Sequence, residues 1–301
     1  MAKVNLPNFM CIGAAKCATT SLYNILKQHP QIGLSSFKEP HFFDNINNFK
    51  NGKEWYLDSY YKNLNSYCAL GEFTPTYLAS KHAPQRILNF FGHKMKFIVI
   101  LRNPVDRSYS HFLHTKRDSH ETLTFVQALE NEDKRLEKTN DNQNFISFLR
   151  YSYIYQSKYY MHIKNYLKFF NMDQFHFVKF DDFVNDRKNT LNKILKFLDV
   201  STNEDLDINV YSNKASVARS KKLKSFMKKN SIVKRIFKLM IPSLVVRQKL
   251  RNIVHASNNK ASAKPVLTQE VRNYLYNQFF CKDILDLEKM LNLNLNTWKE
   301  C

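Results

Sequence analysis

Short apolar runs alternate along the chain with stretches in which apolar residues recur at helical spacing. The first run, at positions 9–13, is followed by helical spacing of apolar residues over 22–26. A second run, at 96–101, is continuous and contains β-branched residues, which is typical of a parallel strand buried on both faces. Positions 175–180, FHFVKF, predict the next parallel strand. The alternation predicts an α/β fold in which helices flank a central parallel sheet of about four or five strands.

A loop of small residues with one lysine joins the first strand to the first helix. It runs from Gly13 to Ser21 and contains Lys16 and a Thr-Thr-Ser sequence. Such a loop directs backbone N–H groups, an ammonium and hydroxyls at one point, an arrangement that suits a phosphate. The spacing differs from the G-x-x-x-x-G-K-[ST] P-loop of nucleotide triphosphatases, because Lys16 precedes the first threonine by three residues.

A second strand-loop-helix motif follows at 96–112. Pro104 ends the strand, so Arg102 lies at its carboxyl end, where open α/β sheets bind ligands. Ser110 follows about two helical turns later and can face the same crevice. The structural alternative for Arg102 is an ion pair with Asp106.

These two motifs resemble the nucleotide-binding motifs of sulfotransferases that use 3′-phosphoadenosine 5′-phosphosulfate (PAPS) as sulfuryl donor. The family has a P-loop-kinase-like fold, and the resemblance implies that fold here. In this family a lysine, two small residues and a Thr-Thr, Thr-Ser or Thr-Arg pair hold the 5′-phosphosulfate. The resemblance implies this binding role for Lys16, Cys17, Ala18, Thr19, Thr20 and Ser21. The family commonly has glycines where Cys17 and Ala18 stand. The resemblance also implies that Arg102 and Ser110 hold the 3′-phosphate.

Two further segments resemble the heparan-sulfate type of sulfotransferases. Positions 38–44 read KEPHFFD, similar to that group's K-E-x-x-F-F segment, and 71–77 resemble its E-K-T-P-x-Y segment, with Phe73 in place of the lysine. The resemblance implies that Glu39 is the base that deprotonates the acceptor. His41 is a rival base, because it titrates near neutrality and would point to the same side on an extended segment. The alternative for His41 is a packed or solvent-facing neighbour.

The implied reaction needs few groups. In-line sulfuryl transfer requires stabilisation of charge on the leaving phosphate and removal of a proton from the acceptor. Lys16 is expected at the leaving group and Glu39 or His41 at the acceptor. By analogy with phosphoryl transfer, positioning and electrostatics are expected to do most of the work, although no metal is expected here. The expected acceptor is a hydroxyl or amine of a carbohydrate, glycolipid or small molecule.

The length and composition predict a single domain, and the resemblance implies that it is a sulfotransferase domain over 1–301. The chain is 44% hydrophobic, and its five cysteines are odd in number and form no C-x-x-C, so reduced thiols are expected. No 18-residue apolar segment is present, and the first strand begins within a few residues of the N-terminus. We therefore expect a cytoplasmic protein that can bind peripherally at a membrane.

The positive charge is concentrated in one segment. Positions 213–260 contain 14 basic and no acidic residues and so carry +14 of the net +20. By resemblance to the family's loop over the 3′-phosphate, Arg219 is a candidate nucleotide ligand. The rest of the segment predicts a basic amphipathic helix, which can lie on an anionic membrane, line a groove for an acidic substrate, or pack its apolar side on the core. No nucleic-acid-binding module is visible, so nucleic acid is not an expected partner.

Two functions of other classes remain open. A nucleotide kinase with a degenerate P-loop is disfavoured because G-K-[ST] is absent. A non-catalytic basic protein that binds membrane or polyanion would have no use for Glu39, Arg102 and Ser110 at these positions.

Overall fold

The computed structural model describes residues 6–62, 64, 67–137, 145–210, 216–218, 259–261 and 265–299. A five-stranded sheet with the order β2-β3-β1-β4-β5 forms its centre, and every neighbouring pair of strands is parallel. The strands are β1 (Phe9–Gly13), β2 (Ile32–Leu34), β3 (Ala69–Phe73), β4 (Lys96–Leu101) and β5 (Phe175–Lys179). The expected fold class is therefore confirmed.

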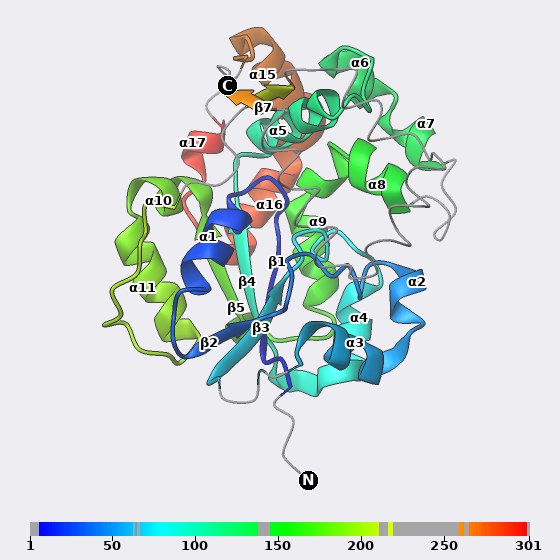
Figure 1. Cartoon of the computed structure of the whole chain (residues 1–301). Coiled ribbons are helices and arrows are strands. Elements are labelled where there is room, and N and C mark those ends of the chain that lie inside the picture. Colours follow the sequence, from blue (N-terminus) through cyan, green and yellow to red (C-terminus); the bar gives the residue numbers. More distant parts are fainter. Residues whose placement is uncertain are drawn as a thin grey trace.

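Helices cover both faces of this sheet (Figure 1). On one side lie α1 (Thr19–Leu26), α10 (Phe180–Asn185) and α11 (Arg187–Phe197), and on the other lie α3 (Gly52–Tyr60), α4 (Ala83–Phe91) and α9 (Tyr159–Tyr166). The long helix α5 (Pro104–Arg117) stands at the carboxyl ends of the strands. The shorter helices are α2 (Ile46–Phe49), α6 (Phe125–Glu130), α7 (Glu132–Glu137) and α8 (Phe145–Tyr151). The C-terminal helices are α15 (Gln269–Leu275), α16 (Cys281–Leu291) and α17 (Asn296–Lys299).

The register of the sheet brings the loops of the two motifs together. Phe9 of β1 lies opposite both Gly71 of β3 and Lys96 of β4. Gly71 is required there, because a Cβ atom would come within 2.5 Å of the Phe9 ring and 2.6 Å of its carbonyl oxygen. Since β1, β3 and β4 are parallel neighbours, the segments that follow them meet at one edge of the sheet.

Two local features are not marked by the sequence patterns above. The segment 69–73 is a fully buried central strand, although it contains Gly71 and Glu72. A 3₁₀ turn, η2 (Tyr155–Ser157), separates α8 from α9. The reason is that the carboxylate of Glu132 accepts the backbone N–H groups of Ile154 and Tyr155, both at 2.7 Å, and so turns the chain away from helical geometry.

Most of the basic segment 213–260 lies outside the described residues. Its two ends form an antiparallel pair, β6 (Ser216–Ala218) with β7 (Asn259–Ala261), in which Ser216 lies opposite Ala261. Strand β6 packs against α5. Among the described helices, none has the length and apolar character needed to cross a membrane.

Candidate functional site

The loop between β1 and α1 has an unusual backbone. Lys16 and Ala18 adopt left-handed conformations, with φ of 72° and 60°. Ala18 is the N-cap of α1, and no side chain caps this helix end, so the first N–H groups of the helix face the loop. A left-handed non-glycine residue costs about 1–2 kcal/mol, which explains why glycines suit this place in the family that the loop resembles.

Lys16 and Arg102 lie side by side although 86 residues separate them. Nη1 of Arg102 donates a hydrogen bond to the backbone carbonyl of Lys16 at 3.4 Å, and its guanidinium lies 4.5 Å from the centre of the Phe180 ring. The alternative ion pair with Asp106 does not form, because both terminal nitrogens of Arg272 hold Asp106 Oδ1, at 2.9 and 3.2 Å. The guanidinium of Arg102 therefore remains at the loop.

A third cation, Arg107, lies behind this loop. Its side chain is completely buried. Nε donates to Ser157 Oγ and Nη2 to the carbonyl of Tyr153, both at 2.5 Å, whereas Nη1 has no partner among the described residues. It lies close enough to Lys16 and Arg102 to repel both electrostatically.

None of the ion pairs between described residues involves any of these three cations. Arg107 is buried, whereas Lys16 and Arg102 are partly buried. Because an unpaired charge that is removed from water is costly, this cluster favours a bound anion. We call Lys16, Arg102 and Arg107 the cation cluster.

The surroundings of Lys16 lower the pKa of its ammonium group. Burial and the nearby charge of Arg117 lower the pKa of the Lys16 ammonium from 10.5 to about 8, although Glu39 and Asp118 act in the opposite direction. The charge of this lysine is therefore sensitive to pH slightly above neutrality.

Glu39 stands beside the cation cluster with an accessible carboxylate. Its backbone N–H donates to the carbonyl of Phe73 at 3.0 Å, which attaches it to the end of β3. The side chain is 43% exposed and forms an ion pair with Lys38. Burial acts to raise its pKa, but the charges of Lys38, His41 and Lys16 outweigh this effect and lower it. Glu39 is therefore ionised at neutral pH and able to accept a proton.

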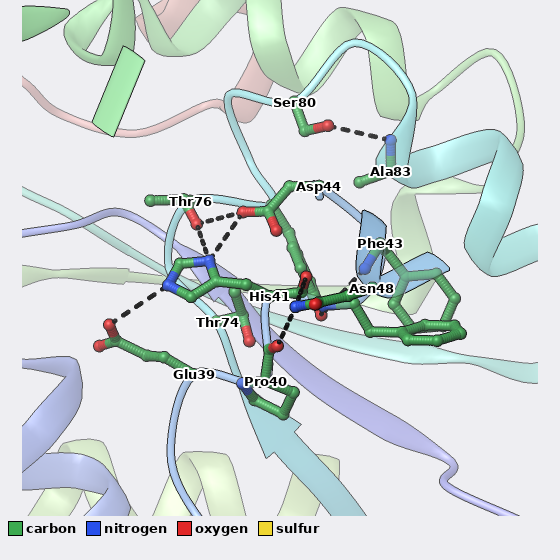
Figure 2. Close-up of polar contacts among 12 residues, drawn as sticks. Glu39, Pro40, His41, Phe43, Asp44, Asn48, Thr74, Thr76, Ser80 and Ala83 are labelled. Carbon is green, nitrogen blue, oxygen red and sulfur yellow. Dashed lines mark hydrogen bonds and ion pairs between the residues drawn. The ribbon is translucent and has the colours of Figure 1, made fainter. Parts of the chain in front are cut away.

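His41 connects Glu39 to a buried carboxylate (Figure 2). Its Nε2 lies 3.8 Å from Glu39 Oε2 and its Nδ1 lies 3.1 Å from Asp44 Oδ2, which also accepts a hydrogen bond from Thr76 Oγ1 at 2.5 Å. Burial opposes the charged imidazolium, but Asp44 and Glu39 raise the pKa of His41 overall. Glu39 and His41 have φ of 65° and 50°, so the segment is not extended as expected, and yet the two side chains meet.

The remaining predicted residues occupy different environments. Cys17 is fully buried, and burial raises the pKa of its thiol to about 11, so it is a packing group. The residues of the helix start are Thr19 and Ser21, which are buried, and Thr20, which is partly exposed. Ser110 is partly buried on α5, two turns beyond Arg102. Arg219 lies outside the described residues.

Sequence reasoning missed Arg107, Asp44 and Tyr159. Asp44 ends the KEPHFFD segment and Arg107 comes five residues after Arg102, so both lay within segments already singled out. Nothing in the local sequence marks Tyr159, because its contact with the loop spans 142 residues. The described part of the chain contains no group of three or more His, Cys, Asp or Glu residues that could hold a metal ion.

Comparison with known proteins gives a consistent result. The model of the family described as "Sulfotransferase domain" matches residues 6–270. The chain is 28% identical over 198 residues to heparan sulfate glucosamine 3-O-sulfotransferase 5 of Mus musculus, covering 65% of this chain and 54% of that protein. It is 30% identical over 204 residues to bifunctional heparan sulfate N-deacetylase/N-sulfotransferase 1 of Caenorhabditis elegans, covering 66% of this chain and 22% of that protein. The chain thus spans about half or less of the length of these relatives.

One solved structure resembles the chain over nearly its full length. The crystal structure of a sulfotransferase from Alicyclobacillus acidocaldarius superimposes with a TM-score of 0.70 at 25% sequence identity, covering 98% of this chain and all of that one.

Proposed function

The chain belongs to the sulfotransferase domain family, and on this premise we propose that it transfers a sulfuryl group from PAPS to a hydroxyl or amine of a carbohydrate-type acceptor. The observation that carries the proposal is the cation cluster at the carboxyl ends of the strands, with the ionised and accessible carboxylate of Glu39 beside it. A donor with two phosphate-bearing ends would balance the unpaired charges of Lys16, Arg102 and Arg107.

The residues divide into two ends of one nucleotide site. Lys16 and the start of α1 suit the 5′-phosphosulfate, since the lysine belongs to the loop that leads into the uncapped N–H groups of the helix. Arg102, with Ser110 on α5, suits the 3′-phosphate. The hydrogen bond from Arg102 to the carbonyl of Lys16 keeps the two ends adjacent.

The proposed reaction uses one acid-base group and one cation. Glu39 accepts the proton of the acceptor hydroxyl while the acceptor oxygen forms its bond to sulfur. The bond between sulfur and the bridging oxygen breaks at the same centre, and Lys16 stabilises the negative charge that remains on the leaving phosphate. The products are the sulfated acceptor and adenosine 3′,5′-bisphosphate, with the proton on Glu39. His41 is the second candidate base, because its Nε2 lies only 3.8 Å from the Glu39 carboxylate.

The acceptor class rests on the relatives. Two of them are named for heparan sulfate, an anionic carbohydrate, and the net charge of +20 of this chain would favour an anionic acceptor. Sulfated products from cells with and without the protein would identify it.

Titration calorimetry tests the donor part of this proposal. The protein should bind adenosine 3′,5′-bisphosphate more tightly than ATP with magnesium. In Arg102→Ala, loss of a charge-assisted hydrogen bond of about 1.5–3 kcal/mol should weaken bisphosphate binding roughly tenfold to hundredfold.

Arg187→Ala is the matched control. Arg187 also lies over a phenylalanine ring, that of Phe183 at 5.2 Å, and its Nη1 also donates to a backbone carbonyl, that of Ile208 at 2.6 Å, but on α11. Its substitution should leave binding unchanged. A preference for ATP with magnesium, or equal losses in the two variants, would refute the proposal.

A further inference from the structure

Tyr159 lies between the two loops of the nucleotide site and has no role in the mechanism above. Its side chain is completely buried. The hydroxyl donates a hydrogen bond to the carbonyl of Arg102 at 3.0 Å and lies 4.0 Å from Sγ of Cys17, the residue after Lys16. We propose that Tyr159 is a positioning residue that sets the place of Arg102 relative to the Lys16 loop. This inference rests on the proposed nucleotide site.

The backbone of Arg102 is a point where such a contact matters. β4 ends at Leu101, and α5 begins only after its N-cap, Asn103, whose side chain accepts the N–H of Val105 at 2.9 Å. Arg102 thus lies between two regular elements. Its side chain makes a long hydrogen bond of 3.4 Å to Lys16 and a contact with Phe180. A hydrogen bond of normal length to its carbonyl therefore constrains the residue more strongly than its side-chain contacts do.

Tyr159 can exert this constraint because hydrogen bonds fix the turn that precedes it. Arg107 donates to Tyr153 and Ser157 at either end of the turn, and Glu132 accepts the two N–H groups between them. Arg107, in the first turns of α5, follows Arg102 by five residues. The contacts therefore form a closed ring that runs from Arg102 to Arg107, through Ser157 to Tyr159, and back to the carbonyl of Arg102.

Removal of the hydroxyl would open this ring without removing any charged group. In Tyr159→Phe the carbonyl of Arg102 loses a donor in a partly buried region, and Arg102 can move away from the position that faces the 3′ end of the nucleotide. We expect binding of adenosine 3′,5′-bisphosphate to weaken about tenfold, whereas binding of adenosine 5′-monophosphate changes by less than about twofold.

Tyr166→Phe is a matched control on the same helix. Tyr166 is also completely buried, and its hydroxyl also donates to a backbone carbonyl at 3.0 Å, that of Tyr77. The two variants should lower the melting temperature of the free protein by a similar amount, about 2–4 °C. Only Tyr159→Phe should weaken bisphosphate binding, a result that general destabilisation cannot produce.

Calorimetry on the full chain decides between the outcomes. In the Arg102→Ala background, Tyr159→Phe should have no further effect on bisphosphate affinity, because Tyr159 acts through Arg102. Wild-type affinity in Tyr159→Phe, equal weakening in Tyr166→Phe, or additive losses in the double variant would overturn the inference while leaving the proposed function intact. Failure of the wild-type protein to bind the bisphosphate would overturn the proposed function and this inference with it.

Discussion

Raising the pH from 7 to 9 should weaken nucleotide binding, because Lys16 loses its proton over this range. Burial and the charge of Arg117 lower the pKa of Lys16 to about 8 in the free protein. A bound phosphate favours the charged ammonium, so the nucleotide must bind the protonated form or provide the energy to protonate it.

The magnitude follows from this pKa. With a pKa near 8, roughly nine-tenths of the Lys16 side chains are charged at pH 7 and roughly one-tenth at pH 9. The affinity for adenosine 3′,5′-bisphosphate should therefore fall about tenfold, which corresponds to about 1.4 kcal/mol. The second ionisation of the phosphates is complete near pH 7, since its pKa is about 6, so it does not contribute over this range.

The stability of the free protein should change in the opposite direction. The folded-state pKa of Lys16 lies below the unfolded value of 10.5, so the unfolded chain binds more protons between about pH 8 and 10.5. The free energy of unfolding contributed by this group therefore rises with pH across that window, by up to about 3 kcal/mol.

Calorimetry at pH 7, 8 and 9 and urea denaturation of the free protein measure the two effects. Lys16→Arg is the control, because a guanidinium stays charged throughout and should remove the fall in affinity. The reasoning is refuted if wild-type affinity is constant from pH 7 to 9, or if the Lys16→Arg variant shows the same decline.

Two carboxylates supply the remaining predictions. Glu39→Gln should keep bisphosphate affinity within about twofold while turnover, measured as bisphosphate released, falls about 10²–10⁴-fold; unaltered turnover would give the role of base to His41. Glu72 is wholly buried, and burial raises its pKa to about 7 against the opposing hydrogen bonds from Tyr56 and Thr74. The folded chain thus binds more protons at Glu72 than the unfolded chain does, and wild-type stability should decline by up to about 3 kcal/mol as pH rises from 4.5 to 7. Urea denaturation at pH 5 and 8 should show a smaller decline in Glu72→Gln, and identical declines would contradict this account.

Strands with a strongly apolar sequence could be predicted. A buried strand that contains small or charged residues could not. β1 and most of β4 are continuous apolar runs, and β5 is rich in aromatic residues, so all three were predictable. In β3, Gly71 leaves room for the Phe9 ring, and Glu72 is hydrogen-bonded inside the core. Neither requirement can be seen in the local sequence.

The same distinction holds for the site. Lys16 and Arg102 were predictable as neighbours, because each follows a strand of one parallel sheet and such strands end at a common edge. The burial of Arg107 and the hydrogen bond from Tyr159 to Arg102 depend on how the turn before α9 packs against α5. No spacing in the sequence specifies this packing.

The unpaired charges of the cation cluster determine what a measurement of stability means for this protein. A ligand that binds only the folded chain stabilises it by about 2.7 kcal/mol when present at a hundred times its dissociation constant. Inorganic phosphate and sulfate are anions, and they could pair with the charges of Lys16, Arg102 and Arg107. We therefore expect the protein to melt at a higher temperature in a phosphate or sulfate buffer, and the intrinsic stability of the free chain is to be measured in a buffer without such anions.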